Sequence, residues 1–121
     1  IAYKAVLRMQ EEFGCAPEDI RAAIGPCIGR CCFEVGPEVP DAMREALGAD
    51  AEAAIEPRGE KAHVDLKLLN RIWLQKAGVQ VIDVSPDCTM CHPDRFWSHR
   101  VTGGARGSQA AIIRLKGGAP A

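Results

Sequence analysis

Three stretches of the chain repeat apolar side chains at the spacing of an amphipathic helix. They cover residues 1–13, 40–47 and 66–77, and a glycine follows each of them directly. Glycine commonly ends a helix, and Asp65 stands where its side chain can cap the third one. The inward positions are Ile1, Ala5, Val6, Met9 and Phe13 in the first helix, Met43 and Leu47 in the second, and Leu66, Leu69, Ile72 and Trp73 in the third.

Shorter apolar runs between turn residues predict strands. Helices and strands mix irregularly along the chain, so the sequence predicts an α+β fold, a mixed-sheet α/β sandwich. Residues 1–115 are expected to belong to one domain, and 116–121 to form a disordered tail. The expected strands are 20–24, 79–84, 95–100 and 110–115, with an extended segment at 33–35, a hairpin of 54–57 with 61–64, and a glycine-rich loop at 103–108.

Composition narrows the classes of partner. The chain is 47% hydrophobic and 26% charged with a formal net charge of −1, which suits a cored domain and gives no general reason to expect nucleic acid. No apolar run approaches the roughly 18 residues that a membrane span needs. No signal peptide is visible, so a cytoplasmic protein is expected. The chain begins with Ile1 rather than Met, which indicates a trimmed protein or a fragment.

Six cysteines offer a first candidate site. Cys88 and Cys91 have the two-residue spacing of a zinc knuckle, and Cys27 with Cys31 can supply a second pair, with Cys32 beside it. The distance between the pairs far exceeds that of common zinc ribbons. On spacing alone, reduced and partly buried thiols are the favoured interpretation over zinc.

Two arginines offer a second candidate. Arg100 and Arg106 flank a segment containing Gly103 and Gly104. Free backbone N–H groups and a guanidinium fork can bind a phosphate, whereas the alternative is a hairpin turn with solvated arginines. The pattern alone favours the turn slightly.

His99 and Glu34 are candidates for acid–base or substrate contacts. His99 follows Phe96 and Trp97, a setting that suits a substrate pocket, although most such histidines are merely packed or exposed. Glu34 lies between apolar neighbours and needs a partner such as Arg100 if it is buried. It can bind ribose hydroxyls or a base edge, or serve in a structural ion pair.

Two longer motifs resemble one known family. Residues 24–36 read IGPCIGRCCFEVG, and residues 87–100 read DCTMCHPDRFWSHR, followed by GGARG at 103–107. Both are similar to motifs of the YfiH-type purine nucleoside phosphorylases, a family also labelled polyphenol oxidase or laccase-like. The resemblance implies that the chain is the C-terminal half of a single YfiH-like domain. It further implies zinc-dependent phosphorolysis of inosine, adenosine, guanosine or methylthioadenosine by the intact protein, with adenosine deamination besides.

The resemblance also assigns roles to residues of this chain. Arg100 is implied to bind an anionic reactant, with Arg106 in support, and Phe33 and Glu34 to shape the nucleoside pocket. His99 is implied to contact the substrate or to orient Glu34. The family often carries a second arginine after the first one, whereas this chain has Val101, so Arg100 alone is the safer assignment.

The family's zinc ligands, two histidines and a cysteine, lie in a segment upstream of Ile1. Cys88 and Cys91 are therefore not expected to be catalytic ligands, this chain alone is expected to be inactive, and it is expected to self-associate through the surface that the other half would cover. Copper-dependent phenol oxidation is a rival, made unattractive by only three histidines. The other rivals are a structural zinc module built on the pairs Cys27/Cys31 and Cys88/Cys91, and a non-catalytic scaffold.

Overall fold

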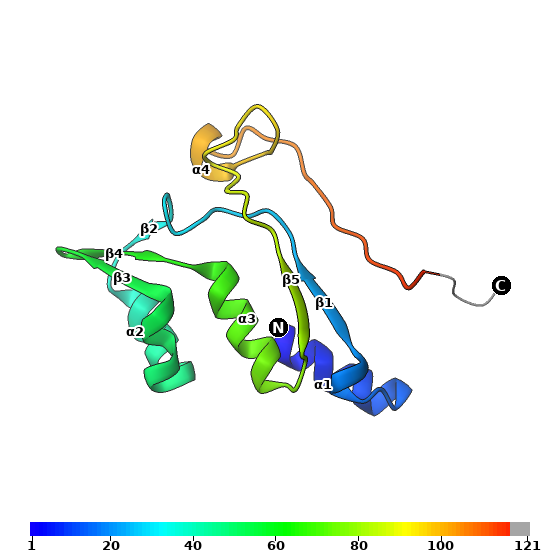
Figure 1. The fold of residues 1–121 in the computed structure, drawn as a ribbon. Coiled ribbons are helices and arrows are strands. Elements are labelled where there is room, and N and C mark those ends of the chain that lie inside the picture. The colour runs from blue at the N-terminus through cyan, green and yellow to red at the C-terminus, as the bar shows by residue number, and fades with distance from the viewer. Residues whose placement is uncertain (117–121) are drawn as a thin grey trace.

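A computed structural model describes residues 1–116 and contains two small sheets (Figure 1). In the first, β1 (Arg21–Ile24) pairs in parallel with β5 (Val81–Val84), with Arg21 opposite Val81. In the second, β4 (Lys61–Val64) lies between β2 (Glu34–Val35) and β3 (Ile55–Arg58), antiparallel to both. Parallel and antiparallel pairs thus occur together, and the predicted α+β fold with mixed sheets is confirmed.

The predicted helices form close to their expected bounds. They are α1 (Ala2–Phe13), α2 (Glu38–Leu47) and α3 (Leu66–Lys76), and 3₁₀ turns cover Pro17–Asp19 and Gly48–Ala54. The Asp65 side chain accepts a hydrogen bond from the Leu68 N–H at 3.0 Å, so it caps α3 as predicted. None of the helices in the described residues is long and apolar enough to cross a membrane.

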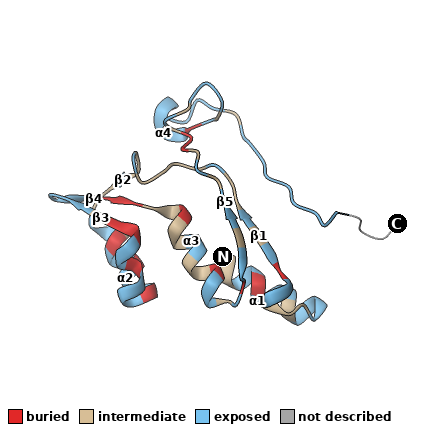
Figure 2. Cartoon of the chain, in the orientation of Figure 1, coloured by how far each residue is buried: buried red, intermediate tan, exposed pale blue. Residues whose placement is uncertain are grey.

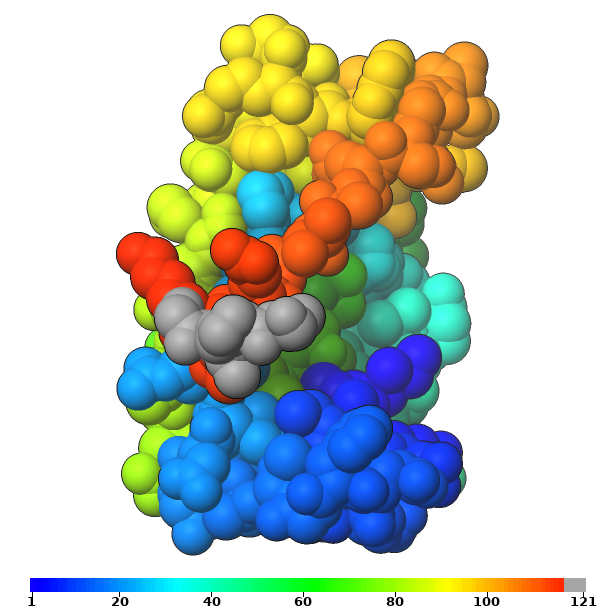
Figure 3. All heavy atoms as spheres, turned by 90° about the vertical axis from the view of Figure 1, so that its right-hand side faces the viewer, coloured from blue at the N-terminus to red at the C-terminus, as the bar shows by residue number. Residues whose placement is uncertain are grey.

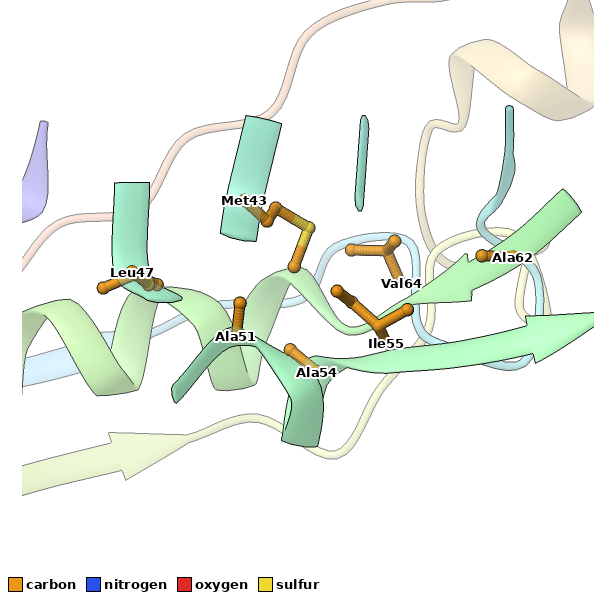
Figure 4. Packing of buried hydrophobic residues seen from close by; sticks show 7 residues of the cluster. All are labelled: Met43, Leu47, Ala51, Ala54, Ile55, Ala62 and Val64. Carbon is orange, nitrogen blue, oxygen red and sulfur yellow. The ribbon is translucent and has the colours of Figure 1, made fainter. Parts of the chain in front are cut away.

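Two apolar clusters hold these elements together. The larger one lies where α2 faces the β3–β4 hairpin, and its seven buried side chains point toward one another (Figure 4). The smaller one joins α1 and α3 to the parallel pair through Val6, Ile20, Leu74 and Val79. Figure 2 shows buried residues gathered at these two places. Of the positions predicted to face inward from the first helix, Val6 is buried, whereas Ile1 and Phe13 at its ends are exposed.

The two parallel strands run in the same direction, so their carboxyl ends reach the same end of the sheet. The two segments stay paired past the strands. The Ser85 N–H donates to the Ile24 carbonyl at 2.8 Å, and the backbones of Cys27 and Cys88 form an isolated parallel β-bridge. Figure 1 shows both strands rising toward α4 (His99–Thr102). The loops that follow β1 and β5 are therefore brought together by the sheet below them.

The strand predicted at 95–100 is wrong. This segment is irregular up to Ser98 and then forms the one-turn helix α4. The Ser98 hydroxyl accepts from the Val101 N–H at 3.4 Å, and Gly103 ends the turn with a left-handed φ of 67°. A serine cap and a glycine four residues after the first helical position favour a helical turn over a strand.

The strand predicted at 110–115 is also wrong, since these residues take no regular structure. The segment runs away from α4 as an extended, unpaired stretch (Figure 1) and lies on the face turned toward the viewer in Figure 3. Ile112 is 93% exposed and Leu115 is 77% exposed. A strand needs a hydrogen-bonded neighbour, and no segment of residues 1–116 supplies one. Apart from Lys116, the predicted tail lies outside the described residues.

Candidate functional site

The loops after β1 and β5 meet at the end of the parallel sheet. The Thr89 N–H donates to the Cys27 carbonyl at 3.1 Å, and the Gly29 N–H donates to the Cys88 sulfur at 3.2 Å. Beyond this junction, away from the sheet, the first loop continues to Phe33 and the second to α4. Residues more than 50 positions apart in the sequence therefore share one site.

A cavity of about 500 Å³ opens between the first loop and the segment around α4. Its volume falls within the range of small-molecule sites. Four of the five residues predicted from the sequence, Phe33, His99, Arg100 and Arg106, line it. We call this cavity the arginine pocket; its other lining residues are Pro26, Cys27, Ile28, Thr89, Trp97, Ser98, Gly107, Ser108 and Gln109.

Arg100 joins the two sides of the arginine pocket. Its Nη1 donates to the main-chain carbonyl of Glu34 at 2.8 Å, and its guanidinium carbon lies 5.1 Å from the centre of the Phe33 ring. This geometry is a cation–π contact, which holds the guanidinium over the aromatic face. One hydrogen bond uses one of the five guanidinium N–H groups, so further donors remain for an anion.

His99 and Arg106 form the second polar pair of the arginine pocket. The Arg106 Nε donates to His99 Nδ1 at 3.4 Å, which requires the proton of a neutral His99 to be on Nε2. Gly107 packs against Trp97 so closely that an added Cβ would lie 2.9 Å from an indole carbon. Trp97 is 51% exposed and leaves an aromatic surface at the pocket.

Glu34 is placed differently from the expectation. Its carboxylate lies 3.6 Å from the Lys61 Nζ and 3.9 Å from His63 Nε2, while Arg100 contacts only its main-chain oxygen. The residues that line the arginine pocket do not include Glu34. The structure therefore brings Phe33, His99, Arg100 and Arg106 together, and leaves the Glu34 carboxylate in an ion-pair group on the neighbouring sheet.

Four thiols converge near the junction of the two loops. The sulfur atoms of Cys31, Cys32, Cys88 and Cys91 all lie within 4.8 Å of one another, an arrangement that can hold a metal ion. Cys91 is 3.4 Å from Cys31 and 3.5 Å from Cys32, sulfur to sulfur. We call these four residues the thiol cluster.

The thiol cluster corrects the cysteine pairs considered from the sequence. Cys27 does not belong to it, because its sulfur is directed to the Ile28 carbonyl at 3.4 Å. Cys32 takes the fourth position instead. The adjacent pair is turned inward by a tight turn in which the N–H groups of Cys32 and Phe33 both donate to the Gly29 carbonyl.

Three of these thiols have shifted pKa values. Burial would raise the pKa of Cys88, but hydrogen bonds from backbone N–H groups, that of Gly29 foremost, outweigh burial and lower its pKa to about 6. Burial raises the pKa of both Cys31 and Cys32, and hydrogen bonding with Cys91 adds to this shift.

Sequence reasoning missed two members of this region. The sequence predicts Trp97 only as a neighbour of His99, although a tryptophan near the glycine-rich segment 103–108 is typical of a contact surface. It predicts Cys32 only as a neighbour of Cys31. The turn-forming Gly29 is the feature that indicates that both side chains can reach one place.

Comparisons with known proteins agree with this architecture. The family described as multi-copper polyphenol oxidoreductase laccase matches residues 1–116. Purine nucleoside phosphorylase YlmD of Bacillus subtilis is 37% identical over 119 residues, which are 96% of this chain and 42% of that protein. Adenosine deaminase RL5 from an unknown prokaryotic organism is 37% identical over 103 residues, 83% of this chain and 39% of that protein.

A solved structure shows the same fold. The crystal structure of YlmD from Geobacillus stearothermophilus superimposes with a TM-score of 0.82 at 39% identity, over 88% of this chain and 41% of that one. The chain thus spans less than half the length of the relatives it matches. Since the family match covers almost the whole sequence and the fold agrees, this chain belongs to the family described as multi-copper polyphenol oxidoreductase laccase and corresponds to part of a YfiH/YlmD-like domain.

Proposed function

We propose that the protein containing this chain cleaves purine nucleosides with phosphate, and that the arginine pocket binds the reactants. The observation that carries the proposal is the convergence of Arg100, Arg106 and His99 on a cavity with aromatic walls. The name of the Bacillus relative, a purine nucleoside phosphorylase, supports it. Inosine, adenosine, guanosine and methylthioadenosine are the proposed substrates.

The reaction requires an anion and a base to be held on opposite sides of the ribose. A phosphate oxygen forms a bond to the anomeric carbon while the bond from that carbon to the purine nitrogen breaks. The bonding electrons leave with the purine, which takes up a proton, and the products are ribose 1-phosphate and the free base. A protein lowers this barrier mainly by positioning the reactants and by placing charge where charge develops.

The arginines, His99 and the two aromatic residues of the arginine pocket each fit one part of this reaction. Arg100 is fixed by Phe33 and the Glu34 carbonyl, and its remaining N–H groups are proposed to bind phosphate. Arg106 is proposed to assist it. His99, held through Nδ1 by Arg106, presents Nε2–H for a hydrogen bond to the nucleoside. Phe33 and Trp97 offer surfaces on which a purine ring can stack.

Glu34 is proposed to contribute through its main chain. Its carbonyl holds Arg100 in place, whereas its carboxylate interacts with Lys61 and His63. It is a positioning residue under this proposal, not a catalytic residue. His99 and Arg100 remain the candidates for direct contact with reactants.

A catalytic zinc bound by residues outside this chain completes the proposal. Zinc can polarise an oxygen of a reactant or activate water, and the second role suits the adenosine deamination for which the RL5 relative is named. Copper-dependent phenol oxidation fits less well, because that reaction needs several copper ions with many histidine ligands, and this chain has three histidines. The chain by itself is accordingly proposed to be inactive.

The test is release of hypoxanthine from inosine by the full natural protein, with and without phosphate. Arg100→Ala is expected to lower kcat/KM by about 100-fold, the usual effect of removing one stabilising donor. Arg58→Ala is the matched control, because Arg58 is exposed, pairs with Glu56 and lies on the far hairpin. Phosphate-independent release, or equal activity of the two variants, would contradict the proposal.

A further inference from the structure

The thiol cluster is built where the two parallel strands end. Cys31 and Cys32 come from the loop after β1, and Cys88 and Cys91 from the loop after β5. None of the four lines the arginine pocket. The phosphorolysis proposed above uses none of these thiols, so their convergence needs an explanation of its own.

We propose that Cys31, Cys32, Cys88 and Cys91 together bind one zinc ion. A zinc ion with four thiolates at about 2.3 Å in tetrahedral geometry places its sulfur atoms about 3.8 Å apart. Two sulfur pairs here are 3.4 and 3.5 Å apart, and all four atoms lie within 4.8 Å. Changes of up to about 1 Å in these separations would therefore centre an ion among them.

The backbone near Cys88 suits a metal-bound thiolate. The Gly29 N–H, from the loop that carries Cys31 and Cys32, donates to the Cys88 sulfur at 3.2 Å. Such a hydrogen bond disperses the negative charge of a coordinating sulfur.

Charge near the thiol cluster complements an anionic metal site. Zinc with four thiolates carries a net charge of −2. A hollow lined by Cys31 and Cys88 is also lined by Arg30, Lys67 and Arg71. The Lys67 side chain is buried and donates to the Asp87 carbonyl, directly before Cys88. Asp65, 3.7 Å from Arg30, also lines this hollow, so three cations face one carboxylate and their net positive charge offsets that of the site.

The spacing of the sulfur atoms favours one ion over a cluster. Four thiolates in a tetrahedral arrangement are typical of zinc or of iron. Within 4.8 Å of one another, the sulfur atoms surround a single ion and leave no room for several irons with bridging sulfides. On binding, each protonated thiol releases its proton to solvent and all four coordinate as thiolates. Zinc needs no redox partner for this step.

A zinc ion here would join the two loops that carry the arginine pocket. Cys32 directly precedes Phe33, and Cys91 begins the segment that leads to Trp97, His99 and Arg100. Hydrogen bonds that also join the two loops run from Thr89 to Cys27, from Gly29 to Cys88 and from Arg100 to Glu34. The ion is thus a structural one, and it fixes the distance between the two walls.

The first test is alkylation mapping of the full natural protein. The protein is treated with iodoacetamide with zinc bound and after chelation, and the modified peptides are quantified by mass spectrometry. Cys31 and Cys91 are exposed, so chelation should raise their alkylation rates by about 10-fold or more. Cys15 and Cys27, which are half-buried and outside the cluster, serve as internal controls with unchanged rates.

The second test is metal content by mass spectrometry of the intact variants. Cys91→Ser should lose one equivalent of zinc per chain, and Cys15→Ser and Cys27→Ser should lose none. If Cys91→Ser fails to fold, the alkylation pattern of the unmodified protein still decides. Equal alkylation of Cys31 and Cys91 with and without zinc would overturn the proposal. So would iron in place of zinc, or a metal-free protein with Cys91 in a disulfide to Cys31 or Cys32.

Discussion

The arginine pocket and the thiol cluster lie on the same two loops, yet they differ in how much of a working site each contains. The thiol cluster brings four ligands within 4.8 Å, enough to complete a tetrahedral zinc site. The His99, Arg100 and Arg106 side chains of the arginine pocket are exposed, and its proposed reaction depends on a metal held elsewhere. The thiol cluster thus has all the ligands of its proposed site, whereas the proposed reaction at the arginine pocket needs a metal bound by other residues.

This difference shows that one region holds the two loops together and that another presents the residues proposed to bind substrate. The parallel pair β1–β5 fixes the two loops at their bases, and the β-bridge between Cys27 and Cys88 joins them next to the sheet. The arginine pocket lies beyond that junction, where Trp97 and Arg100 are exposed. Binding residues at the end of a rigid support are free to meet substrate while their separation is held constant.

The largest effect that separates the two regions is expected from Arg106→Ala in the full natural protein. Removing a charged hydrogen-bond donor from the arginine pocket should raise the KM for phosphate by about 10-fold. Zinc bound by the thiol cluster should not change. Arg114→Ala removes the same charge from the exposed C-terminal segment and is the control. Loss of zinc from Arg106→Ala would show that the two regions are not separable.

A second variant, Gly29→Ala, changes the geometry of the thiol cluster without replacing a cysteine. An alanine Cβ at position 29 would lie 3.3 Å from both the Cys31 sulfur and Cys88 Cβ, so the thiols must shift to accommodate it. Gly29→Ala is therefore expected to weaken zinc binding by about 10-fold, as measured by competition with a chelating dye. Gly25→Ala is the matched control, because its Cβ would meet nothing within 4 Å. Equal zinc affinity of the two variants would argue against the sulfur geometry.

A smaller effect is expected from crowding Trp97. In Gly107→Ala the new Cβ would lie 2.9 Å from the indole ring, which must move away from its place in the arginine pocket. The KM for nucleoside should rise by about 3-fold, since stacking weakens but the arginines remain. The KM for phosphate should stay unchanged. Equal changes in both constants would mean that Trp97 does not act on the nucleoside alone.

The smallest effect is expected far from both regions, at the exposed Arg44–Glu52 pair. The hydrogen bond from Arg44 lowers the pKa of Glu52 below its ordinary value. The pair therefore stabilises the fold above that ordinary pKa, and the contribution is lost as pH falls through the folded pKa. Glu52→Gln should lower the Tm slightly at pH about 7, and the difference from the parent should shrink as the pH falls below the ordinary pKa. A difference that persists in acid would point to lost packing instead.

Local patterns predicted much of the fold. The helix of residues 66–77 follows from its apolar spacing and from Asp65, both readable within one short window. The segment 95–100 was misassigned although Ser98 and Gly103 bracket a helical turn, because its aromatic residues favoured a strand. The segment 110–115 has the composition of a strand, but strand formation depends on a partner that residues 1–116 do not supply.

The sites depended on non-local pairing. The sequence indicated the residues of the arginine pocket through a family motif. It left Glu34 open between a substrate contact and a structural ion pair, whereas the antiparallel pairing sets Glu34 opposite His63 and near Lys61. The zinc module considered from the sequence used Cys27, Cys31, Cys88 and Cys91, whereas the structure has Cys32 in the place of Cys27. Cys32 joins the cluster in place of Cys27 because of the turn at Gly29 and the backbone β-bridge between Cys27 and Cys88. The spacing of the cysteines along the sequence predicts neither feature.

The central claim is that the thiol cluster is a complete four-sulfur zinc site, independent of the arginine pocket. Cadmium-113 NMR of the cadmium-substituted full natural protein tests it most directly, because each metal site gives its own resonance and the shift reports the number of sulfur ligands. The account predicts one resonance in the far-downfield range of four thiolates, retained in Arg100→Ala and lost in Cys91→Ser. Resonances confined to the range of nitrogen- and oxygen-rich sites would contradict it.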